Sequence, residues 1–335
     1  MCVSVEIRRP NSVLGERREK KTREKTNQKP SRHPKMKMAV QFVMRITILV
    51  LLTYELAEAE AAAAPMAKPN CDSSCGNLQI PYPFGIGPDC YMDKLFEVVC
   101  NENGSSAKGF LTSIDKEVLQ INISKRYYYS ESTVQVQMPI IYSNNCRSSG
   151  SGAALNISGS PFNFSFVYNT FVSVGCDNFA KITGPGPVVF GCESHCNKSK
   201  ISKIVERTRC SGFNCCESTY FPSNQQEIQV EFRRIDGSKA REEEGCKYAF
   251  LVDQNRLESK KLDPFSVHYL ETVPMVLEWA ISKRTTKGRN MYESLNKRRE
   301  VMCSFSGYGN DFGSFTCDCA NGYEGNPYLP GGCQG

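Results

Sequence analysis

The sequence predicts a mainly β, disulfide-rich protein of the secretory pathway, and three observations support this prediction. Sixteen of the 17 cysteines lie between residues 71 and 333, a density typical of disulfide-stabilised extracellular chains. Several segments alternate apolar and polar residues with the period of two that a half-buried strand requires. A segment with the layout of a secretory signal peptide precedes the first of these cysteines.

The N-terminal part divides into a leader and a signal peptide. Residues 1–35 carry 11 basic and four acidic side chains and few apolar ones. A solvated tail and a nuclear-localisation patch are both alternatives; we interpret 1–35 as a disordered basic leader, an upstream extension of the gene model. Residues 36–64 combine a basic start, an apolar stretch at Ile46–Leu52 and a run of small residues, so they are predicted to be a signal peptide.

The net charge and the lengths of the apolar segments bear on whether the chain crosses a membrane or binds a polyanion. The apolar stretch at 46–52 is too short to span a bilayer, and no other segment is long and apolar enough to do so. From residue 65 onward the chain has 28 basic and 28 acidic residues. Attraction of the whole domain to a polyanion is therefore not predicted, and any such attraction must be local. Nucleic-acid binding has neither a motif nor a compartment.

Strands are predicted wherever the alternation is sustained, over Val118–Ser124, over Phe162–Tyr168 and in two later segments. The apolar members of these patterns are Leu119, Ile121 and Ile123; Phe162, Phe164, Phe166 and Tyr168; Ile228, Val230 and Phe232; and Met275, Leu277, Trp279 and Ile281. Clusters of Gly, Ser and Pro separate the strands. Residues 283–300 are the best helix candidate, but they are so highly charged that a flexible linker is the alternative.

Five triplets are acceptors for N-glycosylation, which agrees with a secreted chain. Their asparagines are Asn103, Asn122, Asn156, Asn163 and Asn197. Asn122 and Asn163 fall on the polar faces of predicted strands, where a glycan can stand in solvent.

The run CGNLQIPYPFGIGPDC, from Cys75 to Cys90, is rich in proline, glycine and aromatic residues. Its prolines favour an extended ribbon followed by a turn, because the residue before a proline avoids the α region. The ribbon presents Tyr82 and Phe84, and it is either a staple packed in the core or a binding edge. For an isolated aromatic residue the core is the favoured interpretation.

No catalytic motif was found, and neither a cofactor nor a metal site is expected. His195 adjoins Cys196, but a cysteine nucleophile needs a free thiolate, which an oxidising compartment removes. The same argument disfavours zinc at Cys192–Cys196 or at Cys215 and Cys216. The chain is therefore predicted to be a binding module and not an enzyme. The cysteines expected to form disulfides are Cys71, Cys75, Cys90, Cys100, Cys146, Cys176, Cys192, Cys196, Cys210, Cys215, Cys216, Cys246, Cys319 and Cys333.

A family resemblance emerges from ordered motifs. The segments CGNLQIPYPFGIGPDCY, FEVVCN and SGSPFNFSFVYNTFVSVGC resemble the galacturonan-binding module of plant wall-associated receptor kinases. CKYAFLVDQ and VPMVLEWAI resemble that family's C-terminal module, and CDCANGYEGNPYLPGGCQG resembles its first EGF-like repeat. The resemblance implies two β modules in tandem at 71–176 and 177–281, a linker at 282–302 and a partial EGF-like tail at 303–335.

The EGF-like tail departs from the family pattern. In the family the six cysteines pair first to third, second to fourth and fifth to sixth. Here Cys303, Cys317, Cys319 and Cys333 match the last four, so the resemblance implies a Cys319–Cys333 pair. Cys303 and Cys317 have lost their partners and either pair with each other or stay free. We expect 282–316 to be poorly ordered, because one disulfide constrains it weakly, and we expect no calcium binding.

The resemblance implies binding of pectin or its oligogalacturonide fragments, which are polyanions, so a site needs cations as well as aromatic faces. The candidate residues are Tyr82, Tyr91, Lys94, Lys108, Lys125, Arg126 and the tyrosines from Tyr127 to Tyr129. The family often has an arginine where this chain has Gln135, which would weaken binding if that arginine matters. On balance the ribbon is expected to be a structural staple.

The expected protein is thus an extracellular ectodomain of the cell wall or the outer face of the plasma membrane. The sequence stops before the membrane span and kinase of the family, so a truncated gene model, a splice product and a secreted relative are all open. The alternative to pectin binding is a decoy or co-receptor that pairs with receptor ectodomains. An enzyme acting on wall polysaccharide has no positive support.

Overall fold

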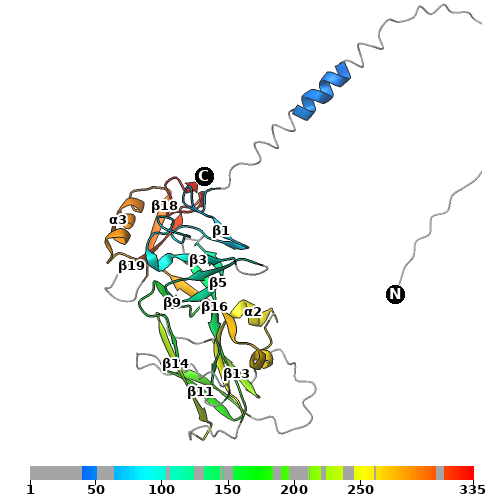
Figure 1. The fold of residues 1–335 in the computed structure, drawn as a ribbon, viewed down its shortest axis with the longest axis vertical. Coiled ribbons are helices and arrows are strands. Elements are labelled where there is room, and N and C mark those ends of the chain that lie inside the picture. Colours follow the sequence, from blue (N-terminus) through cyan, green and yellow to red (C-terminus); the bar gives the residue numbers. More distant parts are fainter. Residues whose placement is uncertain are drawn as a thin grey trace, which may run out of the picture. The chain divides into compact units, whose positions relative to one another are not determined.

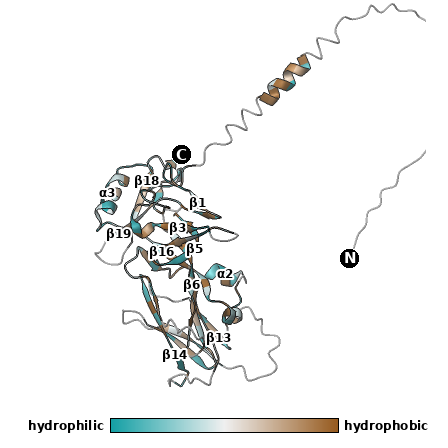
Figure 2. Cartoon of the chain, viewed as in Figure 1, coloured by the Kyte–Doolittle hydropathy of each residue, from teal (hydrophilic) through white to brown (hydrophobic). Residues whose placement is uncertain are grey.

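The computed structural model describes residues 40–50, 64–102, 106–123, 132–143, 146, 154–183, 190–195, 210, 212–219, 224–236, 245–259, 262–306 and 313–335. The chain divides into two compact units, Met1–Ala61 and Ala62–Gly335 (Figure 1). In the first, residues 40–50 form a helix that Figure 2 shows as mostly hydrophobic. Among the described residues, no helix combines the length and apolar character needed to cross a bilayer. The leader and the signal peptide stay predictions.

The largest sheet of the second unit has six antiparallel strands in the order β3-β4-β5-β6-β16-β9. These strands are β3 (Val98–Asn101), β4 (Lys108–Leu111), β5 (Lys116–Asn122), β6 (Thr133–Pro139), β9 (Phe162–Phe164) and β16 (Thr272–Trp279). The late strand β16 pairs with β6 along its length, from Thr272 opposite Pro139 to Glu278 opposite Thr133. Strands from both sides of the expected boundary at residue 176 thus share one sheet, and the division there stays a prediction.

Two further antiparallel sheets have four strands each, in the orders β13-β10-β15-β7 and β12-β11-β14-β8. Their strands are β7 (Ile141–Tyr142), β8 (Ala154–Asn156), β10 (Asn169–Val174), β11 (Asn178–Thr183), β12 (Phe190–Ser194), β13 (Cys215–Ser218), β14 (Glu227–Arg234) and β15 (Tyr248–Asp253). The helix α2 (Gln254–Glu258) follows β15 directly, and the 3-10 helix η3 (Pro264–Tyr269) precedes β16. The predicted mainly β, disulfide-rich fold is confirmed.

The remaining elements come from the beginning and the end of this unit's sequence. The short strands β1 (Ser74–Cys75) and β2 (Leu78–Gln79) form a hairpin, and the 3-10 helix η1 (Lys94–Phe96) precedes β3. The C-terminal part has a three-stranded sheet, β17-β19-β18, and a β20–β21 hairpin. Their bounds are β17 (Ile281–Ser282), α3 (Thr286–Leu295), β18 (Val301–Ser306), β19 (Ser314–Cys319), β20 (Glu324–Gly325) and β21 (Cys333–Gln334).

The expectation that 282–316 is poorly ordered is wrong for its described residues. The ten-residue helix α3 occupies the middle of the predicted linker, and β18 pairs with β19 over six residues. The helix contacts β17 and β18 beside it (Figure 1). Local packing supplies the order that the missing EGF-like disulfides would have supplied, because Leu295 and Phe315 are buried in the same apolar core.

The predicted strands are present, but two of them bury different residues from those expected. A bulge between Val118 and Gln120 shifts the alternation in β5, so Val118 is buried and Leu119 is only partly so. Strand β9 ends at Phe164, since the hydroxyl of Ser165 accepts hydrogen bonds from two following backbone N–H groups. Phe166 is consequently 39% exposed. The patterns in β14 and β16 hold, although Phe232 is only partly buried.

Disulfides connect these sheets. The disulfides among the described residues are Cys71–Cys90, Cys75–Cys100, Cys146–Cys246, Cys192–Cys216, Cys210–Cys215, Cys303–Cys317 and Cys319–Cys333. Cys176 is also disulfide-bonded, and Cys196 lies outside the described residues. The expected Cys319–Cys333 pair is confirmed, and Cys303 and Cys317 pair with each other, which was one of the two alternatives.

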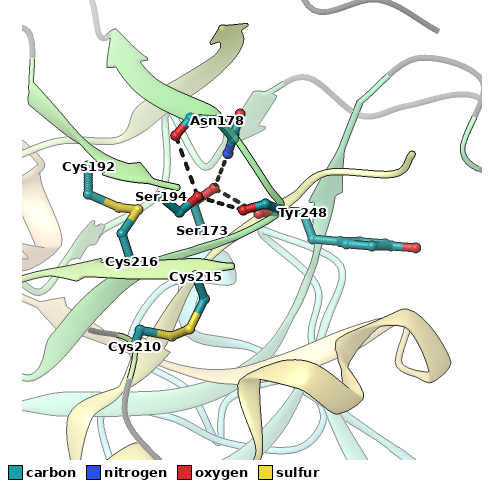
Figure 3. The surroundings of a disulfide bond; sticks show 9 residues. Ser173, Asn178, Cys192, Ser194, Cys210, Cys215, Cys216 and Tyr248 are labelled. Carbon is teal, nitrogen blue, oxygen red and sulfur yellow. Dashed lines mark hydrogen bonds between the residues drawn. A yellow bond between two sulfur atoms is a disulfide. The ribbon is translucent and has the colours of Figure 1, made fainter. Parts of the chain in front are cut away.

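The adjacent cysteines at 215 and 216 belong to two different disulfides, which point to opposite sides of β13 (Figure 3). Beside them Ser173 donates to the carbonyl of Tyr248, while the amide of Asn178 donates to the Ser173 hydroxyl. Zinc at Cys215 and Cys216 is therefore wrong, because both sulfur atoms are already bonded. No cluster of three metal-ligating side chains occurs within the described ranges.

Candidate functional site

The proline-rich ribbon forms a hairpin and a turn inside the fold. After the β1–β2 hairpin, the N–H of Phe84 donates to the carbonyl of Pro81, so the chain turns there instead of running extended. The peptide bond between Tyr82 and Pro83 is cis. The side chains of Ile80 and Phe84 are both 1% exposed. The predicted extended geometry is thus wrong at this turn. The side chains of Ile80 and Phe84 are buried in the core, which agrees with the structural interpretation of the ribbon.

Five aromatic side chains, which we call the aromatic junction, meet beneath this turn. The Phe84 ring centroid lies 5.2 Å from that of Phe96, 5.3 Å from that of Trp279 and 6.3 Å from that of Phe162. Tyr328 of the C-terminal tail adds a fifth ring, 5.7 Å from Trp279. The Phe84–Phe96 and Phe84–Trp279 pairs are edge-to-face, and such pairs contribute about 0.5–1.5 kcal/mol each beyond their buried area. The junction joins the ribbon, the six-stranded sheet and the tail in one core.

The polar atoms of the junction all have partners. The indole N–H of Trp279 donates to the carbonyl of Asn122 over 3.3 Å, and the Tyr328 hydroxyl accepts from the N–H of Cys317 over 2.8 Å. Burial raises the pKa of Tyr328 above its usual value. The junction is therefore a satisfied structural core and offers no ring to a sugar.

Tyr82, a predicted ligand residue, lies at the edge of this core. Its side chain is 6% exposed, and burial raises its pKa to about 12. The ammonium of Lys68 lies 4.8 Å from the Tyr82 ring centroid, and the carbonyl of Tyr82 accepts a hydrogen bond from the side-chain amide of Asn326. A ring covered in this way cannot serve as a stacking platform without a rearrangement.

Tyr91 and Lys94, two of the predicted ligand residues, lie together at the surface. The Lys94 ammonium lies 5.7 Å from the Tyr91 ring centroid, and Tyr91 is partly exposed. Asp93 caps η1 by accepting from the N–H of Leu95, which holds the lysine in place. The ammonium also lies 2.6 Å and 2.7 Å from the two oxygens of Glu97, and this hydrogen bond raises the lysine pKa. Its charge is therefore already compensated by a carboxylate.

Lys108 shows the same compensation on the outer face of the sheet. Its ammonium lies 3.0 Å from a carboxylate oxygen of Glu117 on the neighbouring strand β5. Since both described lysine candidates of this module are ion-paired, a polyanion would have to compete with protein carboxylates there.

Other candidates lie outside the described residues, namely Lys125, Arg126, Tyr127, Tyr128 and Tyr129, together with the acceptors Asn103 and Asn197. Of the remaining acceptors, Asn156 is exposed, while Asn122 and Asn163 are partly buried. The amide of Asn122 donates to the hydroxyl of Thr133. Glycosylation at these positions stays a prediction.

Gln135 faces the interior. Its side chain is 9% exposed and donates to the carboxylate of Asp253, which also caps α2 by accepting from the N–H of Asn255. A side chain at position 135 therefore contacts a buried carboxylate of this fold and not the solvent. The effect of residue 135 on ligand binding stays a prediction.

A second group of cations and rings, which the sequence analysis missed as a site, lies around α3. The Lys283 ammonium lies 3.8 Å from the centroid of Tyr292 and 4.8 Å from that of Phe305. Lys287 and Arg289 are exposed on the helix. We call these five residues the α3 surface. The excess of seven basic over two acidic residues in 283–300 could have indicated a cationic site, but this charge density also suggested a linker.

Comparison with known proteins agrees with this organisation. Residues 71–136 match the family described as wall-associated receptor kinase galacturonan-binding, and residues 207–287 match the family described as wall-associated kinase. No solved structure matches the chain.

Among curated proteins, the chain is similar to three from Arabidopsis thaliana. It is 32% identical to wall-associated receptor kinase-like 10 over 306 residues and 32% identical to wall-associated receptor kinase-like 5 over 285 residues. It is 31% identical to wall-associated receptor kinase-like 6 over 288 residues. Each alignment covers 79% of this chain and 39%, 38% and 44% of the respective relative, so the chain spans about two fifths of their length. With both modules present in this order, the chain belongs to the wall-associated receptor kinase family.

Proposed function

We propose that this protein binds pectin, as polygalacturonate or its oligogalacturonide fragments, outside the cell and without catalysing a reaction. The observation that carries the proposal is the match of residues 71–136 to a galacturonan-binding family. Both matched families are binding or ectodomain modules. The cell wall and the outer face of the plasma membrane are the two places where such a protein would meet this ligand.

The architecture supports a rigid binding scaffold. Two disulfides, Cys71–Cys90 and Cys75–Cys100, fix the ribbon at the start of this module. The aromatic junction fixes its inner side. A preorganised surface binds an extended polymer with less loss of conformational entropy than a flexible one.

The test is a calorimetric titration of the secreted protein with oligogalacturonides at low and at high salt, with a neutral galactan as control. We expect binding that weakens as salt rises, because carboxylate recognition by lysine or arginine is screened. The galactan should not bind. Absence of binding at both salt concentrations would contradict the proposal and favour pairing with receptor ectodomains instead.

A further inference from the structure

The α3 surface is built on a firmly placed helix. Thr285 caps α3 by accepting from the N–H of Gly288, 3.0 Å away. At Gly288 the helix comes so close to β17 that a Cβ atom would lie 2.0 Å from the carbonyl oxygen of Ser282. Leu295 is 1% exposed at the other end. The helix is therefore anchored at both ends, and its outward side chains keep a fixed spacing.

The rings of this surface are also held in place. Tyr292 lies 5.2 Å from the buried ring of Phe315 and 5.5 Å from the ring of Phe305, which is 42% exposed. Lys283 lies over both outer rings and carries no salt bridge among the described residues. A cation–π contact holds an ammonium in position but leaves its positive charge available to an anion.

Four exposed cations on or beside α3 have no carboxylate partner among the described residues. Lys287, Arg289, Lys297 and Arg299 are exposed, and none of them takes part in a salt bridge with a described residue. Residues 283–300 carry a formal charge of +5, whereas the chain from residue 65 onward is neutral. Because α3 extends about 15 Å, this charge is spread along one segment and is suited to a row of anions.

We infer that the α3 surface is a binding site for an acidic polysaccharide, with lysine and arginine pairing with uronate carboxylates beside the rings of Tyr292 and Phe305. Arginine recognises a carboxylate through two parallel N–H donors, and the exposed part of the Phe305 side chain offers apolar surface next to these cations. The inference rests on the proposed function and moves its electrostatic part from the 71–136 module to the C-terminal part of the chain.

The test compares three forms of the full secreted chain: the wild type, Lys287→Glu/Arg289→Glu and the matched control Lys181→Glu/Arg256→Glu. Both variants change the net charge equally, and the control residues lie on β11 and α2, outside both the α3 surface and the 71–136 module. The probes are polygalacturonate and polyglutamate at about 50 mM salt. Circular dichroism and thiol titration verify that each variant is folded and oxidised.

We expect the α3 reversal to weaken polygalacturonate binding by on the order of tenfold and to reduce its salt dependence, while the control changes affinity less than about twofold. Equal binding by all three forms would overturn the inference and leave the proposed function intact. Equal loss in both variants would overturn it as well, because only net charge would matter. Polyglutamate binding as tight as polygalacturonate binding would overturn the assignment to a polysaccharide. Absence of wild-type binding would overturn the proposed function and, with it, this inference.

Discussion

A lysine lies over an aromatic ring in two regions of this molecule, and the two lysines differ in what else they contact. In the galacturonan-binding module, Lys94 lies beside Tyr91 and also pairs with both carboxylate oxygens of Glu97. On the α3 surface, Lys283 lies over Tyr292 and Phe305 without a salt bridge to any described residue. The residue types are the same, but only the second lysine has its charge available. Both lysines lie close to an aromatic ring, so this proximity alone does not distinguish the two regions. The absence of a competing carboxylate is the feature that led us to infer a polyanion site at the α3 surface.

The aromatic junction and the α3 surface differ in how far their rings are exposed to solvent. Phe84 and Trp279 in the aromatic junction are 1% and 2% exposed, whereas Phe305 on the α3 surface is 42% exposed. The buried rings of the junction stabilise the fold, whereas the exposed ring of Phe305 is accessible to solvent. Each of the following predictions tests one part of this contrast.

The largest expected effect is that of Phe84→Ala. Removing a fully buried ring from the aromatic junction should lower the free energy of unfolding by about 3–5 kcal/mol. The measurement is urea unfolding with intact disulfides, followed by the fluorescence of Trp279, the single tryptophan of the chain, which lies 5.3 Å from Phe84.

The matched control is Phe305→Ala, which removes the same side chain from an exposed position and should cost no more than about 1 kcal/mol. Similar losses for the two variants would show that the contrast between a buried junction and an exposed surface is wrong.

An intermediate effect is expected from Tyr82→Phe in alkali. Burial raises the Tyr82 pKa from 10.0 to about 12, so the unfolded chain loses this proton first. The contribution of Tyr82 to stability is thus complete below pH 10 and is lost between pH 10 and 12. At pH 11 the variant should retain on the order of 1 kcal/mol that the wild type has lost.

Unfolding curves at pH 8 and pH 11 check this prediction, with Tyr269→Phe as the control because Tyr269 is 81% exposed. If Tyr82→Phe and the wild type lose the same stability between these two pH values, Tyr82 ionises in the folded protein as easily as in the unfolded chain.

The smallest expected effect is that of Lys94→Met on polygalacturonate binding. Since the charge of Lys94 is compensated by Glu97, its removal should change the dissociation constant less than about twofold. A loss comparable with that of the α3 reversal would instead identify Tyr91 and Lys94 as the principal site and reverse the comparison.

Sequence patterns predicted the β class, the dense disulfides and the buried faces of β14 and β16, because these depend on local periodicity and on cysteine chemistry. The bulge at Leu119 could not be predicted, since alternation alone does not reveal an extra residue in one strand. The pairing of β6 with β16 joins segments far apart in the sequence, and local sequence patterns do not predict which distant strands pair.

The candidate ligand residues stay predictions. Tyr91 and Lys94 lie together, and the ion pair of Lys94 with Glu97 depends on η1 and was not foreseen. Residues 283–300 were predicted as the best helix candidate, with a flexible linker as the alternative because of their charge, and α3 confirms the helix. Its order depends on tertiary contacts of Leu295 and Tyr292, which no local pattern records.

The side-chain amide of Asn326 donates to the carbonyls of both Met66 and Tyr82, over 2.8 Å and 2.7 Å. A Cβ atom at Gly325 would lie 2.8 Å from that of Ala64, so the first and last described segments of the 64–335 region lie side by side. In mechanical terms, tension between these two ends acts on a pair of hydrogen bonds before it reaches any sheet. Pulling would then have to withdraw Tyr328 from the aromatic junction before the C-terminal hairpin could leave the ribbon, and the Cys319–Cys333 disulfide would still hold β21 to β19.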